Sequence, residues 1–191
     1  MNEDRIQSYL DAHRERLELL KRMWLDPKVQ CYNDKIPPTR GEPGWGGSVF
    51  LAGPTSYQHI LEFNWRCYAV KYLRDAGFKG WIFIPESRGE ERKGDYPDRS
   101  YIHNWESSRL FTAKHMLFWI PRNNNELFGL NTNHELGIVV GMIYQGAKAS
   151  TFIGWPDDAI RMGLPGHYVD VFARKPIYTD LKAMCEAVAA A

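Results

Sequence analysis

Short apolar runs that alternate with longer segments of helical periodicity constrain the fold of this chain most strongly. Runs of this length, bounded by glycine, proline or polar residues, are typical of buried strands. Strands that alternate with helices form a parallel sheet covered on both faces. We therefore predict an α/β fold with a flavodoxin-like or Rossmann-like open parallel sheet of four or five strands and helices on both faces. The predicted strands are residues 48–52, 81–85, 116–120, 150–153 and, last, 168–172.

The segments between these runs predict the helices. Their apolar residues recur at three- and four-residue spacing, and Gly77 ends the first of them. Residues 86–100 form a polar loop that is longer than a simple connection requires, so we expect it to be functional or mobile. The predicted helices span about residues 57–76, 101–113, 135–146 and from 179 to the C-terminal end.

The first 46 residues form an N-terminal extension of a different character. Residues 2–24 predict one amphipathic helix, which packs either on its own domain, the favoured interpretation, or on a second subunit. Residues 26–46 are rich in proline and glycine and predict a loop or linker. We therefore divide the chain into an extension, 1–46, and an α/β domain, 47–191.

Composition and charge exclude several classes of protein. The 191 residues carry a formal net charge of +1 and no long basic run, which argues against a nucleic-acid partner. No apolar run suits a signal peptide or a membrane span, and the three cysteines lack metal or disulfide spacing, so we expect a cytoplasmic protein. No dinucleotide or ATP phosphate-binding motif follows a strand, and we expect no cofactor and no metal.

Polar and turn-forming residues follow the predicted strands, where ligands of such sheets bind. Gly53-Pro54, Pro85-Glu86 and Pro121-Arg122 end three strands, and a loop leads from the third to Glu135. We expect Glu135 near the start of its helix, where free N–H groups and the helix dipole favour a carboxylate. It would then be ionised at neutral pH, as a carboxylate nucleophile must be. The alternative is a glutamate that only stabilises its helix.

Glu106, on the preceding helix, is the second candidate carboxylate. A nucleophilic carboxylate and an acid/base carboxylate are the pair that retaining glycosyl transfer requires. Sequence spacing does not show whether Glu106 and Glu135 face each other, and the pattern alone indicates an α/β enzyme with a polar site at the sheet edge. Aromatic residues make up 14% of the chain, and Trp45, Trp105 and Trp119 either stack on a flat ligand or, as we favour, pack in the core.

Five segments, taken in order, resemble the nucleoside 2-deoxyribosyltransferase-like family. The resemblance runs from about Ser48 to the C-terminal helix, and it is nearest to an uncharacterised branch with a Phe-Trp-Ile-Pro-Arg segment. The segments are Val49-Phe-Leu-Ala-Gly-Pro-Thr55, Phe83-Ile-Pro-Glu86, Trp105-Glu106, Leu117-Phe-Trp-Ile-Pro-Arg122 and Thr132-Asn-His-Glu-Leu-Gly137.

This resemblance implies a flavodoxin-like fold and cleavage of the bond between a nucleobase and C1′ of a (deoxy)ribose. It implies that Glu135 is the nucleophile and that Glu106, where relatives have Asp, protonates or binds the base. Gly53 lies on the loop that approaches the sugar. Asn133 orients the nucleophile or the sugar hydroxyls, and family sites are often completed across a dimer, so we expect a homodimer or a higher homo-oligomer. The expected substrate-binding residues are Gly53, Pro54, Glu86, Trp105, Arg122, Gly129 and Asn133.

Departures from the family leave the substrate open. Val49 stands where defined transferases have a Tyr, and Gly129 stands where transferases use an acid and nucleotide hydrolases a Ser. Arg122 either binds a 5′-phosphate or forms a surface salt bridge. The sequence does not separate transferase from hydrolase, or nucleoside from nucleotide. The alternatives are a non-catalytic nucleoside- or nucleotide-binding sensor of the same fold and a processor of nucleotide or NAD-derived signals.

Overall fold

One six-stranded, all-parallel sheet forms the centre of the computed structural model, which describes residues 3–32, 34, 47–55, 64–87, 99–123, 127–147 and 150–191. The strand order is β1-β3-β2-β4-β5-β6, and all five neighbouring pairs are parallel. The predicted open parallel α/β fold is confirmed, although the sheet is larger than the four or five strands expected. The strands are β1 (Val29–Cys31), β2 (Val49–Ala52), β3 (Ile82–Ile84), β4 (His115–Trp119), β5 (Thr151–Gly154) and β6 (Ile177–Tyr178).

The additional strand, β1, lies in the segment predicted as a loop or linker. Its residues pair with β3, from Val29 opposite Ile82 to Cys31 opposite Ile84, and all three are buried. A three-residue strand beside a proline- and glycine-rich stretch is too short to show an alternating pattern. The linker prediction for residues 26–46 is therefore wrong at β1, and residues 33 and 35–46 lie outside the described part of the chain.

The strand predicted at residues 168–172 is also wrong. Helix α5 (Gly163–Tyr168) continues into a π-helical turn, Val169–Ala173, and the last strand is the two-residue β6. Val169 and Ala173 are buried while Val171 and Phe172 are exposed. Burial at four-residue spacing is helical, so the β-branched composition of this segment suggested the wrong period.

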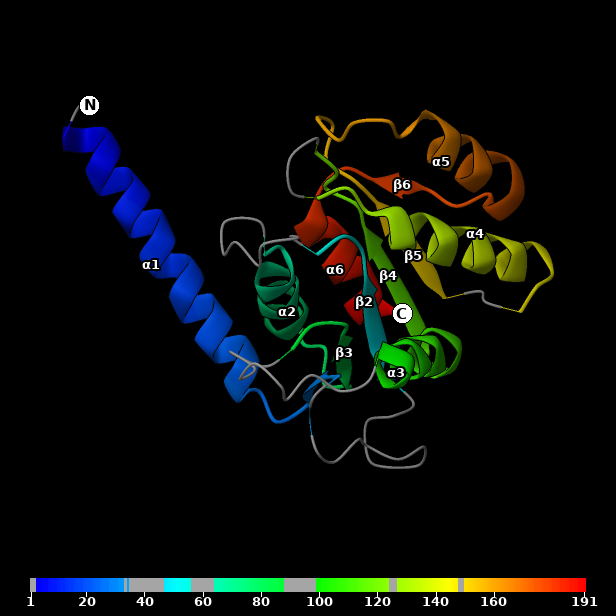
Figure 1. The fold of residues 1–191 in the computed structure, drawn as a ribbon, viewed down its shortest axis with the longest axis horizontal. Coiled ribbons are helices and arrows are strands. Elements are labelled where there is room, and N and C mark those ends of the chain that lie inside the picture. The colour runs from blue at the N-terminus through cyan, green and yellow to red at the C-terminus, as the bar shows by residue number, and fades with distance from the viewer. Residues whose placement is uncertain are drawn as a thin grey trace.

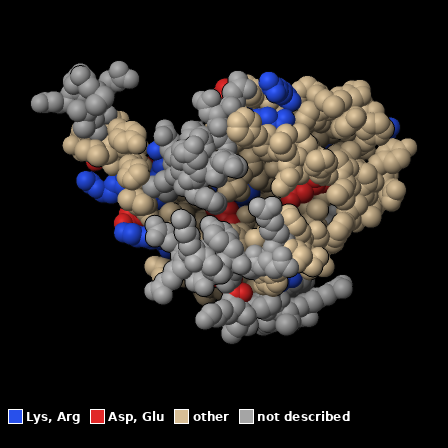
Figure 2. Space-filling model, in the orientation of Figure 1, with Lys and Arg blue, Asp and Glu red and all other residues tan. Residues whose placement is uncertain are grey.

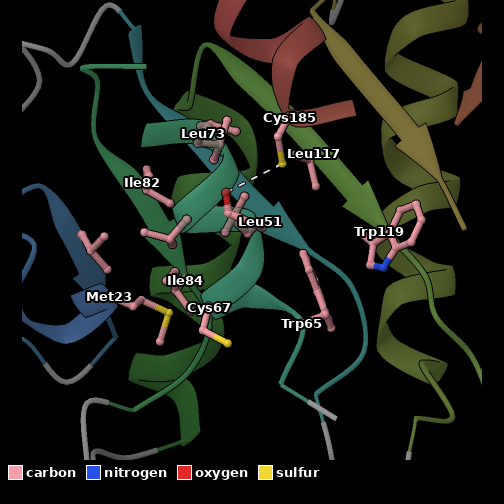
Figure 3. Close-up of a cluster of buried hydrophobic side chains, with 14 of the residues drawn as sticks. Met23, Leu51, Trp65, Cys67, Leu73, Ile82, Ile84, Leu117, Trp119 and Cys185 are labelled. Carbon is pink, nitrogen blue, oxygen red and sulfur yellow. Dashed lines mark hydrogen bonds between the residues drawn. The ribbon is translucent and has the colours of Figure 1, made fainter. Parts of the chain in front are cut away.

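Helices cover both faces of the sheet (Figure 1). On one face, the helices bury side chains against alternate strand residues such as Leu51 and Leu117. Figure 3 shows this cluster, in which the Cys185 thiol donates a hydrogen bond to the Ala69 carbonyl oxygen at 3.7 Å. On the other face, Phe50 and Phe118 pack against the second group of helices. The first group is α1 (Glu3–Leu25), α2 (Arg66–Asp75) and α6 (Leu181–Ala190). The second is α3 (Arg99–Thr112) and α4 (Leu130–Tyr144), together with the π-helical turn Val169–Ala173.

Helix α1 confirms the amphipathic helix predicted for residues 2–24. Its C-terminal half packs on the first face through Leu19 and Met23, while its N-terminal half extends away from the sheet (Figure 1). No helix in the described part of the chain has the length and apolar character needed to cross a bilayer.

The strand order places a ligand crevice between β2 and β4. Without β1, the order β3-β2-β4-β5-β6 is the flavodoxin-like order 2-1-3-4-5. The chain leaves β2 towards β3 and leaves β4 towards β5, so the connections diverge at this point. Ligands of open α/β sheets bind at the carboxyl ends of the strands where the direction reverses.

Candidate active site

A cavity of about 510 Å³ opens at this reversal point. The turn after β2, the end of β3, helix α3 and the beginning of α4 all contribute to its walls. Figure 2 shows acidic atoms beside the start of α4, within a surface that is otherwise mostly uncharged over α4 and α5. The cavity is lined by Gly53, Pro54, Thr55, Pro85, Glu106, Phe128, Gly129, Leu130, Asn131, Thr132 and Glu135.

Gly53 lets the chain after β2 pass tightly over the end of β4. Its φ is +153°, and a Cβ atom there would lie 2.1 Å from the Trp119 carbonyl oxygen and 2.7 Å from the Trp65 ring. Any side chain would therefore clash with backbone that is fixed in the sheet. The turn brings Pro54 and Thr55 to the cavity wall. Gly53 and Pro54, both expected to bind substrate, thus line the cavity.

Arg66 holds this turn in place from beneath. Its side chain is fully buried, and its guanidinium donates to the carbonyl oxygens of Leu51 (3.2 Å) and Gly53 (2.6 Å) and to the Thr55 hydroxyl oxygen (2.9 Å). It also pairs with the Glu86 carboxylate at 2.5 Å. Sequence reasoning missed Arg66, because a basic residue on a helix ordinarily indicates a solvated position.

Glu86 serves the scaffold rather than the cavity. Its carboxylate accepts hydrogen bonds from Arg66 and, at 3.2 Å, from the Asn64 side chain. Pro85, its neighbour, lines the cavity in its place. The structure thus does not bring the predicted substrate-binding Glu86 to the site.

The fold brings Glu106 and Glu135 together, which the sequence left open. Glu106 lies in the middle of α3 and Glu135 in the second turn of α4, and both line the 510 Å³ cavity. They also line a smaller cavity of about 220 Å³ between the two helices. After burial, the negative charge of Glu106 contributes to the raised pKa of Glu135, as expected of neighbouring carboxylates.

The protonation expected for Glu135 is wrong. Burial, and then the charge of Glu106, raise its pKa to about 7, against a lowering by Arg66. The reason is that α4 begins at Leu130. Glu135 therefore lies in the second turn, beyond the free N–H groups of the first turn that would favour its ionised form. Burial also raises the pKa of Glu106, opposed by the charges of His103 and Arg66. At neutral pH the pair therefore holds a carboxyl group that readily gains or loses a proton.

Gly129 turns the chain from β4 into α4 at the edge of the cavity. Its φ of +63° is left-handed, and a Cβ atom there would lie 3.4 Å from Pro54 Cβ and 3.6 Å from Arg122 Nη2. Gly129 thus lines the cavity as predicted, in a conformation that L side chains rarely adopt. Asn131 and Thr132 follow it on the cavity wall.

Among the described residues that line the cavity, the aromatic one is Phe128 and none is a tryptophan. Trp105 is buried between Phe50 and Phe83, at 6.4 Å between ring centroids in each case. Trp119 is buried on the opposite face of the sheet, and Trp45 lies outside the described residues. Phe128 is 51% exposed. Nothing in the sequence distinguished it from the other phenylalanines.

Arg122 and Asn133 lie at a neighbouring cavity of about 520 Å³, on the α5 side of α4. Arg122 is buried, so it does not form the surface salt bridge considered from the sequence. Its guanidinium donates to the Asn133 side-chain oxygen and, at 3.4 Å, to the Arg161 carbonyl oxygen. Both cavities are lined by Phe128 and Leu130, at the start of α4.

Among the described residues, no group of three or more His, Cys, Asp or Glu side chains is arranged to hold a metal ion. No family model matches this chain, and no curated protein does. Among solved structures, the chain is similar to a conserved protein from Enterococcus faecalis V583, with 14% sequence identity and a TM-score of 0.50. The match covers 74% of this chain and 96% of that chain. At this identity the similarity shows a shared α/β fold.

Proposed function

We propose that this protein cleaves or transfers at the N-glycosidic bond of a (deoxy)nucleoside or (deoxy)nucleotide, through a glutamyl–glycosyl intermediate. The observation that carries the proposal is that Glu106 and Glu135, from two helices, line one cavity at the reversal point of the sheet. Glycosidic chemistry uses two carboxyl groups with separate roles, and the charge of Glu106 contributes, after burial, to the raised pKa of Glu135.

Each carboxyl group has one role in the proposed reaction. Ionised Glu135 attacks C1′, the bond from C1′ to the base nitrogen breaks, and its electron pair leaves with the base. Glu106 binds the edge of the departing base through a hydrogen bond, and the base takes its proton from solvent. Water or a second base then attacks C1′ and loses a proton to solvent, and the bond between C1′ and the Glu135 carboxylate breaks. Attack by water makes the protein a hydrolase, and attack by a second base makes it a transferase.

The remaining walls suit a nucleoside. A volume of about 510 Å³ lies within the range of small-molecule sites. The exposed ring of Phe128 offers a face on which a base can stack. The positive charge of Arg66 favours the ionised form of Glu135, the form that attacks. Compartment and assembly belong to the same proposal: a cytoplasmic homodimer or higher homo-oligomer.

Base release from deoxynucleosides and their 5′-monophosphates, followed by chromatography with and without an acceptor base, tests the proposal. We expect release by the wild type, and loss of at least about 10²-fold in Glu135→Gln, since that variant lacks the nucleophile. Glu186→Gln, on the exposed side of α6, is the matched control and retains activity. Equal activity in Glu135→Gln would contradict the role of Glu135.

The second candidate is a nucleoside or nucleotide sensor that does no chemistry. The raised pKa of Glu135 favours it, because a protonated carboxyl group binds a ligand but does not attack it. Tight binding of one of these deoxynucleosides or monophosphates by the wild type, without release of base or formation of a new nucleoside, would favour the sensor over the enzyme.

A further inference from the structure

The cavity beside the candidate active site has the features of a second ligand site. It measures about 520 Å³ and lies on the face of α4 that packs towards α5. Leu136 and Val140 of α4 form one apolar wall, and Leu164 and Tyr168 of α5 form the other. Glu106 and Glu135 do not line it. Its polar lining includes two arginines, Arg122 and Arg161.

Arg122 is a buried cation without an anionic partner among the described residues. Arg122 is only 7% exposed, and its Nε has no hydrogen-bond acceptor in the described part of the chain. The groups that accept from its other nitrogens, the Asn133 amide and the Arg161 carbonyl, are neutral. An unpaired buried charge is costly, so such a group ordinarily has a counter-ion.

Arg161 adds a second positive charge instead of compensating the first. It is exposed, lines the same cavity, and has a left-handed φ of +54°. Burial, and then the charge of Arg161, lower the pKa of Arg122. No carboxylate is among the described residues that line the cavity. Arg122 and Arg161 thus both line a space to which the described residues contribute no negative charge.

We propose that this cavity binds an organic anion, whose phosphate or carboxylate pairs with Arg122 and Arg161 and whose apolar body packs between α4 and α5. Guanidinium groups suit such oxyanions because their donors match the oxygens in pairs. The apolar walls exceed what an inorganic ion needs and select a ligand with an aromatic or aliphatic part. This inference stands on the cavity alone and does not depend on the proposed glycosidic chemistry.

Phenyl phosphate is a suitable probe because it has both parts of the expected ligand. Calorimetric titration should show one binding event per chain, weaker binding of inorganic phosphate, and no binding of phenol. Arg122→Met and Arg161→Met should each weaken phenyl phosphate binding by about tenfold or more, as the loss of a charged hydrogen-bonded pair implies. Lys182→Met, an exposed cation on α6, is the matched control and leaves the affinity unchanged.

Glu135→Gln separates this site from the candidate active site. We expect it to leave phenyl phosphate affinity unchanged even if it abolishes base release. Affinity that is lost in Glu135→Gln and kept in Arg122→Met would place the anion in the catalytic cavity and overturn the proposal. Failure of the glycosidic reaction would leave this binding result standing, so the two proposals fail separately.

Melting temperatures check that Arg122→Met remains folded. Removing a buried cation that lacks a counter-ion should leave the ligand-free protein as stable as the wild type or more stable. Phenyl phosphate should raise the melting temperature of the wild type and not that of the variant. A lowered melting temperature with unchanged probe affinity would identify Arg122 as a scaffold residue and refute the anion site.

A saturating deoxynucleoside distinguishes two sources of the anion. If phenyl phosphate affinity is unchanged, the cavity takes a separate small molecule, and if binding is lost, the cavity takes the phosphate end of a nucleotide held in the catalytic site. Both results support an anion site at Arg122. Binding of phenol as tight as that of phenyl phosphate would refute it.

Discussion

Glu135 determines how the proposed reaction responds to pH. Burial and the neighbouring Glu106 charge raise its pKa to about 7, and only the ionised carboxylate attacks C1′. We therefore expect kcat/KM to rise with pH through a midpoint near pH 7 and to level off at higher pH, in a profile measured from about pH 5 to 9. A profile that falls through pH 7 would instead make Glu135 the proton donor and Glu106 the nucleophile.

The same residue links stability to pH. Because the folded-state pKa of Glu135 is raised, its contribution to stability is present below pH 4.5 and is lost as pH rises through about 7. Glu135→Gln should therefore be more stable than the wild type at pH 8 by about 1–2 kcal/mol, a value reduced for the partial exposure of the residue. Urea unfolding at pH 8 and pH 4 measures this, with Glu186→Gln as control. An equal gain at both pH values would contradict the linkage.

At the scale of elements, the connection from β2 to α2 depends on Arg66. The guanidinium joins the turn after β2 to Glu86 after β3, and all of these groups are buried or partly buried. Arg66→Met should lower the free energy of unfolding by about 3–5 kcal/mol, because it leaves the Glu86 charge without its partner. Arg66→Met with Glu86→Gln should recover part of that loss. A loss below about 1 kcal/mol in denaturant unfolding would show that the pair is dispensable.

Long apolar strands were predictable from the sequence, and short elements were not. The run that contains Met116 and Phe118 is buried on both faces, so its composition alone indicated β4. Residues 29–31 and 177–178 pair with neighbours that lie far away in the sequence, which no local pattern reveals. The start of α4 was misplaced because Gly129 begins the helix without a side-chain cap that would have marked it.

At the scale of the whole molecule, the carboxylate pair depends on topology. Glu106 and Glu135 are separated along the sequence by β4, and they meet because α3 and α4 cover the same face of the sheet. The order of the strands therefore decides whether the two residues meet. The sequence predicted only the fold class, an open parallel sheet, and not this order. Arg66 was missed for a related reason: its partners, Thr55 and Glu86, follow two different strands.

Helix α1 is the feature through which we expect a second copy to bind. Leu19 and Met23 are buried on the chain itself, whereas Tyr9, Leu10 and Leu17 are 58%, 49% and 40% exposed. The interpretation that this helix packs on its own domain thus holds for its C-terminal half, and packing on a second subunit stays a prediction for the other half. An extended helical half with uncovered apolar groups gains stability by packing on another surface.

The double variant Leu10→Glu, Leu17→Glu should therefore lower the molar mass in solution from that of an oligomer to that of a monomer, measured by light scattering. Gln7→Glu with Ser8→Glu, at exposed polar positions of the same helix, adds the same negative charge as control and should leave the mass unchanged. Because Leu19 and Met23 still fix the C-terminal half of α1, the double variant should remain folded. A wild type that is already monomeric, or a double variant of unchanged mass, would leave the exposed half of α1 without this role.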